Sequence, residues 1–357
     1  MVNARYLGTF VLGMILFNTM FFSIEGAAQD RDPEFVDALK QQPHIVWPDC
    51  IITDIDGKIL KKMIGYLCVP FSDGTYLSTN DKYLRFFSAD NEIVNKLEIY
   101  PHHQLKTHSN DTRILAIGSK YSEYKGKKNR FDVIYEISRE GDILKEFDFG
   151  RNFSKYLAAA NIQTEIEPWY YPENTKENQE LTHINSIYRI EKNSLSGKVS
   201  GFAEGNYIVN DNLLKRIVIL GPKLEKIVKI FPFVKGTEAI HDVSVKKDGN
   251  LLLFNNLPEG YNTQVSSIDI WNPTTLAVVK RYQPHNPKEF SQYKCGGVQE
   301  LESGEYMFYD NNLKVNILSK NFKFKSKAPM RPFEYQDLIQ EIKAGDHSEF
   351  LKNNVEW

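Results

Sequence analysis

The sequence predicts an all-β protein, a six-bladed β-propeller with a helical insertion and a short helical C-terminal tail. Two observations lead to this fold class. A turn motif recurs in which a polar residue and a glycine precede an alternating apolar strand, as in SDGTYLSTN, AEGNYIVND, KDGNLLLFNN and ESGEYMFYD. Several copies are followed by β-rich stretches, which makes a four-stranded unit of about 40 to 55 residues, the period of propeller blades.

Five copies of this unit begin near residues 66, 102, 183, 241 and 295. A sixth blade is implied by residues 44–63, HIVWPDCIITDIDGKILKKM, which carry only an outer hairpin. A strand from the other end of the chain would complete that blade, so the propeller is predicted to span residues 44–325. A solenoid is a weaker alternative because such arrays usually carry polar capping repeats, and a non-repeating sandwich is weaker still.

Three segments fall outside the repeat. Residues 1–28 are predicted to be a signal peptide, with one arginine before an apolar run and small residues before a cut after Ala28, so the protein is expected to be periplasmic or secreted. An uncleaved anchor is the alternative, and the only arrangement with a membrane contact. Residues 151–181 begin with a helix-like stretch and continue as an aromatic loop of the kind that is often functional. Residues 326–357 have helical spacing and are predicted to form a C-terminal helical extension.

Charge and cysteine content exclude several functions. Lys and Arg number 44 against 46 Asp and Glu, a net charge of -2, so nucleic acid is not an expected partner. The composition carries no signal for an oligomeric state. Cys50 and Cys68 either bridge neighbouring strands and leave Cys295 unpaired, or all three are buried thiols. No spacing matches a CxxC metal or redox site.

Histidines recur at one position of the blade. His103 lies 9 residues before Thr112 of its turn, and His241 lies 8 residues before Gly249. His183 opens another blade in the same way. This position begins the innermost strand, so the three side chains are expected to converge on the central channel. The alternative is a coincidence of three structural histidines.

Four segments resemble one protein family. LTHINSIY and IHDVSVKKDGNLLLFNN are similar to two signatures of bacterial arylsulfate sulfotransferases, which are six-bladed periplasmic propellers. PHHQLKTHSNDTRILAI and CGGVQELESGEYMFY resemble two further blade starts of that family. The similarity covers about residues 66–325 and keeps the family's order.

The resemblance implies transfer of a sulfuryl group from an aryl sulfate to a phenol, without a cofactor, through a sulfated histidine. Matched by motif, the nucleophile is His241, and the further channel histidines are His183 and His103, or its neighbour His102. Asn185, within the matched HINS motif, is expected to bind substrate. A neutral imidazole is a competent nucleophile near pH 7, and Asp242 is a candidate for holding a ring in one tautomer.

The sequence also departs from the family. Asn212 stands where the family has an arginine that helps bind the sulfuryl group, and an amide cannot replace a guanidinium fork. The nucleophile's blade ends in Asn255 and Asn256 followed by Leu257, which alters the family pattern. Two alternatives therefore stay open, a non-catalytic propeller that binds a ligand or protein, and a metal site of three neutral imidazoles.

Overall fold

The computed structural model describes residues 44–327 with gaps. The segments left out within that range are 47–49, 55–58, 66, 72, 81, 109–111, 164–165, 167–178, 236, 238, 257–265, 284–295, 302 and 310–314. The predicted signal peptide, most of the predicted C-terminal extension, the aromatic part of the insertion and Cys295 therefore lie outside the described residues.

The described chain forms six antiparallel sheets that follow one another in sequence. The first contains β1 (His44–Val46), β2 (Ile51–Asp54) and β3 (Ile59–Lys62). The second contains β4 (Cys68–Pro70), β5 (Tyr76–Thr79), β6 (Tyr83–Phe87) and β7 (Ile93–Glu98). The third contains β8 (Leu105–His108), β9 (Arg113–Tyr124), β10 (Lys127–Ser138) and β11 (Ile143–Asp148), and the short β12 (Gln179–Glu180) pairs in parallel with β10. The fourth contains β13 (Ile184–Arg189), β14 (Tyr207–Asp211), β15 (Arg216–Leu220) and β16 (Ile227–Pro232). The fifth contains β17 (Ile240–Val245), β18 (Leu251–Asn255), β19 (Ser267–Asn272) and β20 (Ala277–Tyr282). The sixth contains β21 (Val298–Glu300), β22 (Tyr306–Tyr309), β23 (Val315–Leu318) and β24 (Phe324–Lys327).

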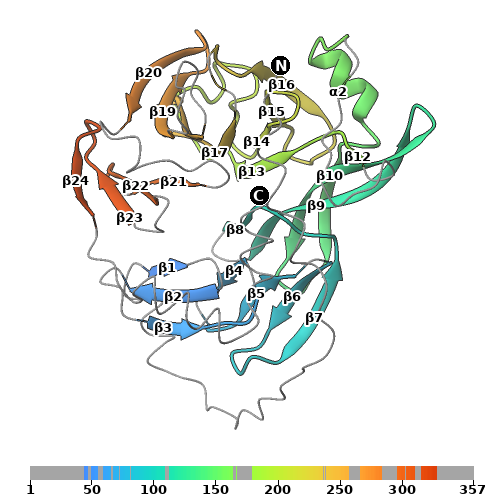
Figure 1. Ribbon diagram of the computed structural model, residues 1–357, viewed down its shortest axis with the longest axis vertical. Helices are drawn as coiled ribbons and strands as arrows, with labels where there is room; N and C mark the ends of the chain where they lie inside the picture. The colour runs from blue at the N-terminus through green and yellow to red at the C-terminus, as the bar shows by residue number, and fades with distance from the viewer. Residues whose placement is uncertain are drawn as a thin grey trace, which may run out of the picture.

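These sheets are arranged around a common centre, which makes the protein a β-propeller (Figure 1). Within each of the last five sheets the strands follow sequence order, and the first strand faces the centre: β8 contacts β4 and β13, and β13 contacts β17. The five blade starts expected from the repeat are therefore confirmed.

The blade count differs from the prediction. Five sheets have four or more strands, whereas the N-terminal sheet has three, and no late strand of the described residues pairs with it. The structure thus has five complete blades rather than six. Residues 44–63 supply three short strands of their own instead of an outer hairpin.

Turn chemistry explains why the repeat was visible in the sequence. Gly74, Gly205, Gly249 and Gly304 all have φ between 77° and 91°, which side chains with a Cβ rarely adopt. Gly249 is also packed closely, since a Cβ there would lie 2.4 Å from Leu195 Cγ. Each of these turns joins the first two strands of a blade.

Apolar side chains hold neighbouring sheets together. Five clusters of buried side chains each contain residues from adjacent sheets. Between the blades that start with β4 and β8, for example, Phe86 packs in one cluster with Tyr135. Each fully buried side chain of this kind contributes roughly 1.5–3 kcal/mol. The inner ends of the blades are thereby held at defined positions around the channel.

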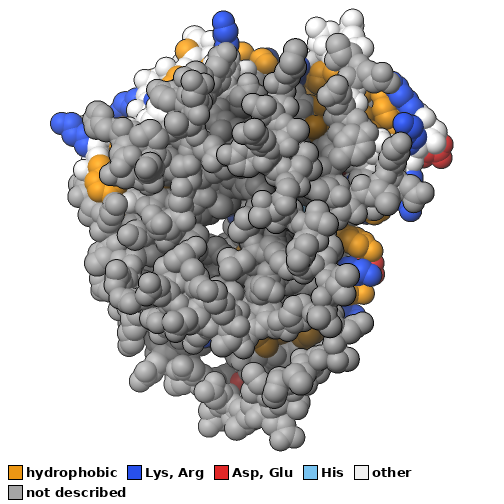
Figure 2. Space-filling view, in the orientation of Figure 1, with side chains coloured by type: hydrophobic (Ala, Val, Ile, Leu, Met, Phe, Trp, Pro, Cys, Tyr) orange, Lys and Arg blue, Asp and Glu red, His pale blue; other side chains and the backbone are white. Residues whose placement is uncertain are grey.

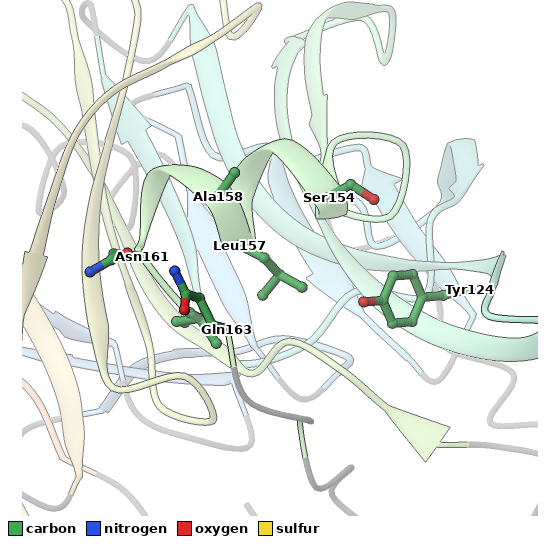
Figure 3. A pocket seen from close by; sticks show the side chains of 7 residues that line it. Tyr124, Ser154, Leu157, Ala158, Asn161 and Gln163 are labelled. Carbon is green, nitrogen blue, oxygen red and sulfur yellow. The ribbon is translucent and has the colours of Figure 1, made fainter.

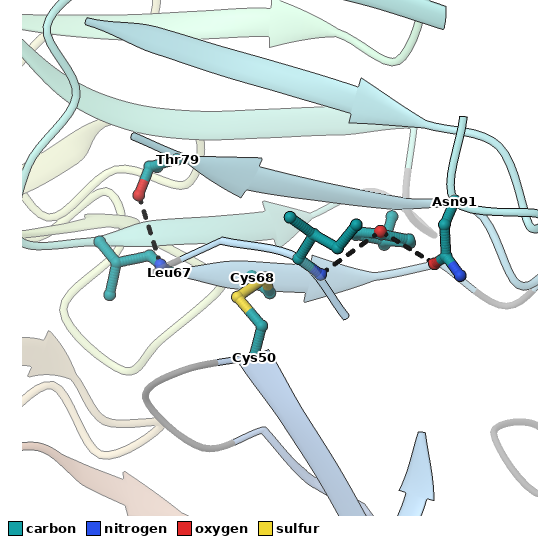
Figure 4. Close-up of a disulfide and its surroundings, with 7 residues drawn as sticks. Cys50, Leu67, Cys68, Thr79 and Asn91 are labelled. Atoms are coloured by element: carbon teal, nitrogen blue, oxygen red, sulfur yellow. Dashed lines mark hydrogen bonds between the residues drawn. A yellow bond between two sulfur atoms is a disulfide. The ribbon is translucent and has the colours of Figure 1, made fainter. Parts of the chain in front are cut away.

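A disulfide joins the N-terminal sheet to the first complete blade. Cys50 precedes β2 and Cys68 begins β4, and their Cα atoms are 5.2 Å apart (Figure 4). On the same blade the Thr79 hydroxyl accepts a hydrogen bond from the Leu67 backbone N–H at 3.3 Å. Of the two alternatives for the cysteines, the Cys50–Cys68 bridge is the one observed.

The periphery carries one helix and a long hairpin. The helical start of the insertion is confirmed as α2 (Phe153–Ala159), and β24 ends at Lys327, two residues beyond the predicted limit of the propeller. Figure 2 shows lysine and arginine side chains over the tip of the β9–β10 hairpin, where Lys125, Lys127 and Lys128 are exposed. Among the residues described, no helix is long and apolar enough to cross a membrane.

Candidate functional site

The predicted histidines come together at the inner ends of three consecutive blades. His102 and His103 lie just before β8 and are separated from it by Gln104, His183 directly precedes β13, and His241 is the second residue of β17. The ring centroid of His103 lies 4.8 Å from that of His102, 4.9 Å from that of His183 and 6.4 Å from that of His241. We call these four residues the histidine cluster, and its centre is His103.

The backbone holds His103 in an uncommon conformation. Its φ is 58°, and the Gln104 N–H donates to the His102 carbonyl at 2.8 Å, which closes a three-residue turn. Gln104 then crosses to the next blades, where its Oε1 accepts from the Ile187 N–H at 2.7 Å and its Nε2 donates to Asp242 at 3.3 Å. Such a conformation persists only where the surroundings enforce it, and it is common at functional sites.

A buried carboxylate lies beside His102. The Nε2 atom of His102 lies 3.0 Å from Asp132 Oδ1, and the other oxygen of Asp132 accepts from the Ile184 N–H at 2.8 Å. Asp132 is completely buried in the middle of β10. The Nδ1 atom of His102 in turn lies 2.5 Å from Nδ1 of His103. Asp132 and His103 thus contact the two ring nitrogens of His102.

Glu180 contacts the ring of His183 and changes its pKa. Its Oε2 lies 3.0 Å from His183 Nδ1, and both side chains are buried. Burial alone would lower the pKa of His183, but the Glu180 carboxylate, with further contributions from Asp132 and Asp211, raises that pKa above its usual value. The Glu180 carboxylate thus favours the imidazolium form of His183.

His103 has the opposite tendency. Burial, followed by the neighbouring His102, His183 and His241 and by Arg130, holds its pKa well below the usual range. A neutral imidazole therefore lies at the centre of the cluster, next to an imidazole that favours the charged form.

The partner of His241 is Asn256, not Asp242. Asn256 Oδ1 lies 2.6 Å from His241 Nδ1, and because an amide oxygen only accepts, Nδ1 carries the hydrogen. A neutral His241 then has its lone pair on Nε2. Asp242 points elsewhere, and its oxygens accept from Gln104 and from the Val298 N–H. The expectation that Asp242 holds a ring was wrong, because successive side chains of a strand face opposite sides.

The amides of Asn185 and Asn212 contact the backbone beside His241. Asn212 Oδ1 accepts from the Ile240 N–H at 2.9 Å, and Asn185 Nδ2 donates to the Ile240 carbonyl at 3.2 Å. These bonds fix the start of β17, so both residues position the residue that precedes His241. Asn185 Oδ1 is buried without a hydrogen-bond partner among the described residues and is the atom of this pair that fits a substrate donor.

Sequence reasoning missed a cation whose charge acts on the cluster. Arg130 Nε donates to Ser119 Oγ at 2.9 Å and lies 4.0 Å from Glu180 Oε1. Its charge lowers the pKa of both His103 and Glu180. In the sequence, Arg130 is the last residue of a short basic cluster, KGKKNR at residues 125–130, and nothing there links it to the histidines. Glu180 had a local signal in the sequence, because it is an acidic residue only three positions before His183.

The insertion is tied to the cluster through a buried pair. Tyr156 of α2 donates to Asp211 Oδ2 at 3.0 Å, while Asp211 Oδ1 accepts from the His183 N–H at 3.1 Å. Burial, helped by the charge of Asp132, raises the pKa of Asp211 to about 6. Helix α2 therefore supports the backbone at His183.

A separate pocket of about 490 Å³ lies beside α2, and Tyr124 of β9 points toward Leu157 across it (Figure 3). It is lined by Tyr124, Ser154, Leu157, Ala158, Asn161, Ile162 and Gln163. Its described lining residues include no acidic, basic or histidine side chain, and none of them belongs to the histidine cluster. Within the described ranges, no three His, Cys, Asp or Glu side chains are arranged to hold a metal ion.

Comparison with known proteins gives a fold likeness and no family. No protein-family model matches the chain, and no curated protein matches it. A protein of unknown function from Bacteroides caccae is 14% identical with a TM-score of 0.48, over 80% of this chain and 91% of that one. The Cps50 (Swd1) β-propeller domain of Myceliophteria thermophila is 9% identical with a TM-score of 0.43, over 79% and 81% of the two chains. The Pan2 WD40 domain of Neurospora crassa is 11% identical with a TM-score of 0.40, over 73% and 64%. At these values the β-propeller assignment depends on the sheets themselves.

Proposed function

We propose that the protein is a sulfotransferase that moves a sulfuryl group from an aryl sulfate to a phenol through a sulfated His241. The observation that supports this proposal is the convergence of His103, His183 and His241 from three blades, each ring with its own oriented partner.

In the first step, the lone pair on Nε2 of His241 attacks the sulfur of the donor. An N–S bond forms, the bond from sulfur to the aryl oxygen breaks, and the phenolate leaves and takes a proton from solvent. In the second step, the oxygen of the acceptor phenol attacks sulfur and loses its proton to solvent, the N–S bond breaks, and its electron pair returns to Nε2. The first step needs a lone pair on Nε2 of His241, and the contact with Asn256 favours the tautomer that has it.

Two cations are available for the charge on the sulfuryl oxygens. His183 contacts one oxygen of Glu180 through Nδ1, and Arg130 Nε lies 4.0 Å from the other oxygen of Glu180. In this proposal Arg130 takes over the role for which the related family uses an arginine at the position of Asn212. A preorganised donor of this kind is typically worth about 100-fold to 1000-fold in rate.

The test is turnover of a chromogenic aryl sulfate with phenol as acceptor. His241→Asn should abolish turnover and leave the circular dichroism spectrum unchanged. His108→Asn is the matched control, because His108 lies at the other end of β8 beside Glu136 and should leave turnover intact. Brief exposure of the parent protein to donor alone should give a sulfated His241 peptide by mass spectrometry. Turnover without this peptide, or an active His241→Asn variant, contradicts the proposal.

A protein that turns over no aryl sulfate but binds one, measured by calorimetry, would instead be a ligand-binding propeller. We further propose a periplasmic or secreted location, with the first 28 residues removed. The Cys50–Cys68 disulfide supports this location because disulfides persist in oxidising compartments.

A further inference from the structure

We propose that Lys128, held over the ring of Tyr121, binds an anionic group at the far end of the acceptor, so that the acceptor is a phenol extended by an acidic group. This inference rests on the proposed sulfuryl transfer and names the class of its acceptor. It follows from one face of the β9–β10 hairpin, which leads outward from the histidine cluster.

The β9–β10 hairpin begins beside the histidine cluster. Each of its strands has 12 residues, whereas the innermost strand β8 has 4. The first residue of β8, Leu105, pairs with Ala116, and the His102 N–H donates to the Ile117 carbonyl at 3.0 Å. The rest of β9, up to Tyr124, therefore extends past the start of β8 on the side of the histidines, and the hairpin projects from the ring of blades (Figure 1).

One face of this hairpin carries three cross-strand pairs in a row, and we call it the hairpin stripe. The pairs are Asp132 with Ser119, Arg130 with Tyr121, and Lys128 with Glu123. Two contacts confirm that these pairs share a face. Arg130 Nε donates to Ser119 Oγ at 2.9 Å, and Lys128 Nζ lies 5.0 Å from the centre of the Tyr121 ring. The second contact is a cation–π interaction, which favours one position for the ammonium group of Lys128.

The opposite face of the hairpin packs against helix α2. The rings of Tyr124 and Phe131 each lie 4.9 Å from the ring of Phe153, in edge-to-face contact. Lys127 pairs with Tyr124 and so belongs to this face, although its side chain is exposed. Lys127 therefore matches Lys128 in charge and exposure but points away from the hairpin stripe.

The hairpin stripe changes from buried to open along its length. Asp132, which contacts the cluster, is completely buried, the Arg130 side chain is 21% exposed, and Tyr121 is 43% exposed. Lys128 at the outer end is exposed as well. Residues on one face of a strand are about 6.6 Å apart, so Lys128 lies about 13 Å along β10 from Asp132. Glu123, opposite Lys128, is also exposed, so solvent screens its charge.

These dimensions define the acceptor. Its phenol oxygen has to reach the sulfuryl group on His241, and its body then lies along the hairpin stripe. A flat part of the acceptor can stack on the exposed ring of Tyr121, and an anion at its far end meets the ammonium group of Lys128. Binding energy from this remote end holds the phenol in place for transfer. A phenol that ends in a carboxylate, at about 13 Å from the reacting end, has this shape and charge.

The test compares two acetylated peptide amides as acceptors. Each contains a tyrosine, three glycines and then either glutamate or glutamine, so that an extended chain covers about 13 Å between the two ends. In the parent, kcat/KM for the glutamate peptide should exceed that for the glutamine peptide by about threefold at low salt, the usual size of an exposed ion pair. Added salt should reduce this ratio, because it screens the pair.

Three variants assign the ratio to one side chain. Lys128→Glu should bring the ratio to one or below, because it replaces attraction by repulsion, and Lys128→Arg should keep the ratio of the parent. Lys127→Glu is the matched control, since it makes the same change of charge on the opposite face of the hairpin. It should also keep the ratio of the parent.

The outcomes separate this inference from the proposed function. Turnover with equal kcat/KM for the two peptides supports the sulfotransferase and overturns the role of Lys128. A loss of the ratio in Lys127→Glu or Lys128→Arg as large as that in Lys128→Glu would overturn it too. If the parent transfers no sulfuryl group, dissociation constants of the two peptides, measured by nuclear magnetic resonance titration, replace kcat/KM. The expected pattern in these constants then supports the hairpin stripe as a binding site while the sulfotransferase proposal is rejected, and equal constants reject both.

Discussion

Glu136 should be a major contributor to stability at neutral pH. It lies on β10, is 3% exposed, and accepts hydrogen bonds from Lys145 Nζ at 3.0 Å and from the hydroxyl of Tyr207. His108 and Arg113 also lie beside it, at 3.7 and 3.8 Å. Because Tyr207 belongs to β14, this carboxylate joins two neighbouring blades. The perturbation is Glu136→Gln, which keeps the shape of the side chain and removes its charge.

The pKa of Glu136 indicates the size of the effect. Burial alone would raise it, but hydrogen bonds from His108, Tyr207 and Lys145 lower the pKa from 4.5 to about 2. This difference corresponds to about 3 kcal/mol of unfolding free energy. Solvent screens part of it, because the side chains of Arg113 and Lys145 are 41% and 31% exposed, so we expect about 2 kcal/mol.

The sign of the pH dependence follows from the lowered pKa. The contribution of Glu136 is complete above the unfolded value of 4.5 and is lost as the pH falls toward about 2. Glu136→Gln should therefore be less stable than the parent at pH 7, and the gap should narrow at about pH 3. Urea unfolding followed by far-ultraviolet circular dichroism at both pH values measures this difference.

The control is Glu92→Gln, a carboxylate exposed at the start of β7. It should leave the urea midpoint unchanged at both pH values. A Glu136→Gln midpoint equal to that of the parent at neutral pH would refute the reasoning. A loss of the same size at both pH values would show that shape, not charge, is responsible.

Three further predictions concern the disulfide and the histidine cluster. Replacing both Cys50 and Cys68 with alanine should lower the unfolding free energy by about 3 kcal/mol, because a bridge across 18 residues no longer restricts the unfolded chain; an unchanged urea midpoint would contradict this. Glu180→Gln should lower the pKa of His183, because it removes the carboxylate that favours the imidazolium. A nuclear magnetic resonance titration of His183 measures this pKa, and an equal pKa in parent and variant would contradict the role of Glu180. In Asn256→Asp the hydrogen of the His241 ring should stay on Nδ1, because a carboxylate also accepts, whereas Asn256→Leu should lose this preference. The nitrogen chemical shifts of the His241 ring measure the tautomer, and equal shifts in the two variants would disprove the role of Asn256.

The repeat unit and the start of each blade were predictable because turns are local. Gly205 or Gly249 requires only its own φ and the alternating strand that follows, and both are visible in a few consecutive residues. The histidines at one position of the unit followed from the same repeat, since equal places in equal units face the same channel. Six complete blades were not predictable, because closing a ring depends on pairing between distant segments, and the N-terminal sheet has only three strands.

Most partners of the histidines were decided by tertiary structure. Asp132 reaches His102 from two strands away in the same blade, and Asn256 reaches His241 from the end of the neighbouring strand. Asp242, adjacent to His241 in sequence, faces Gln104 instead. Glu180 is the exception, because it lies only three residues before His183. The sequence by itself determined which rings begin the innermost strands, through turn spacing and strand alternation. Only the pairing of strands decided that Asp132 lies beside His102 and Asn256 beside His241, because these contacts join segments whose separation along the chain has no fixed period.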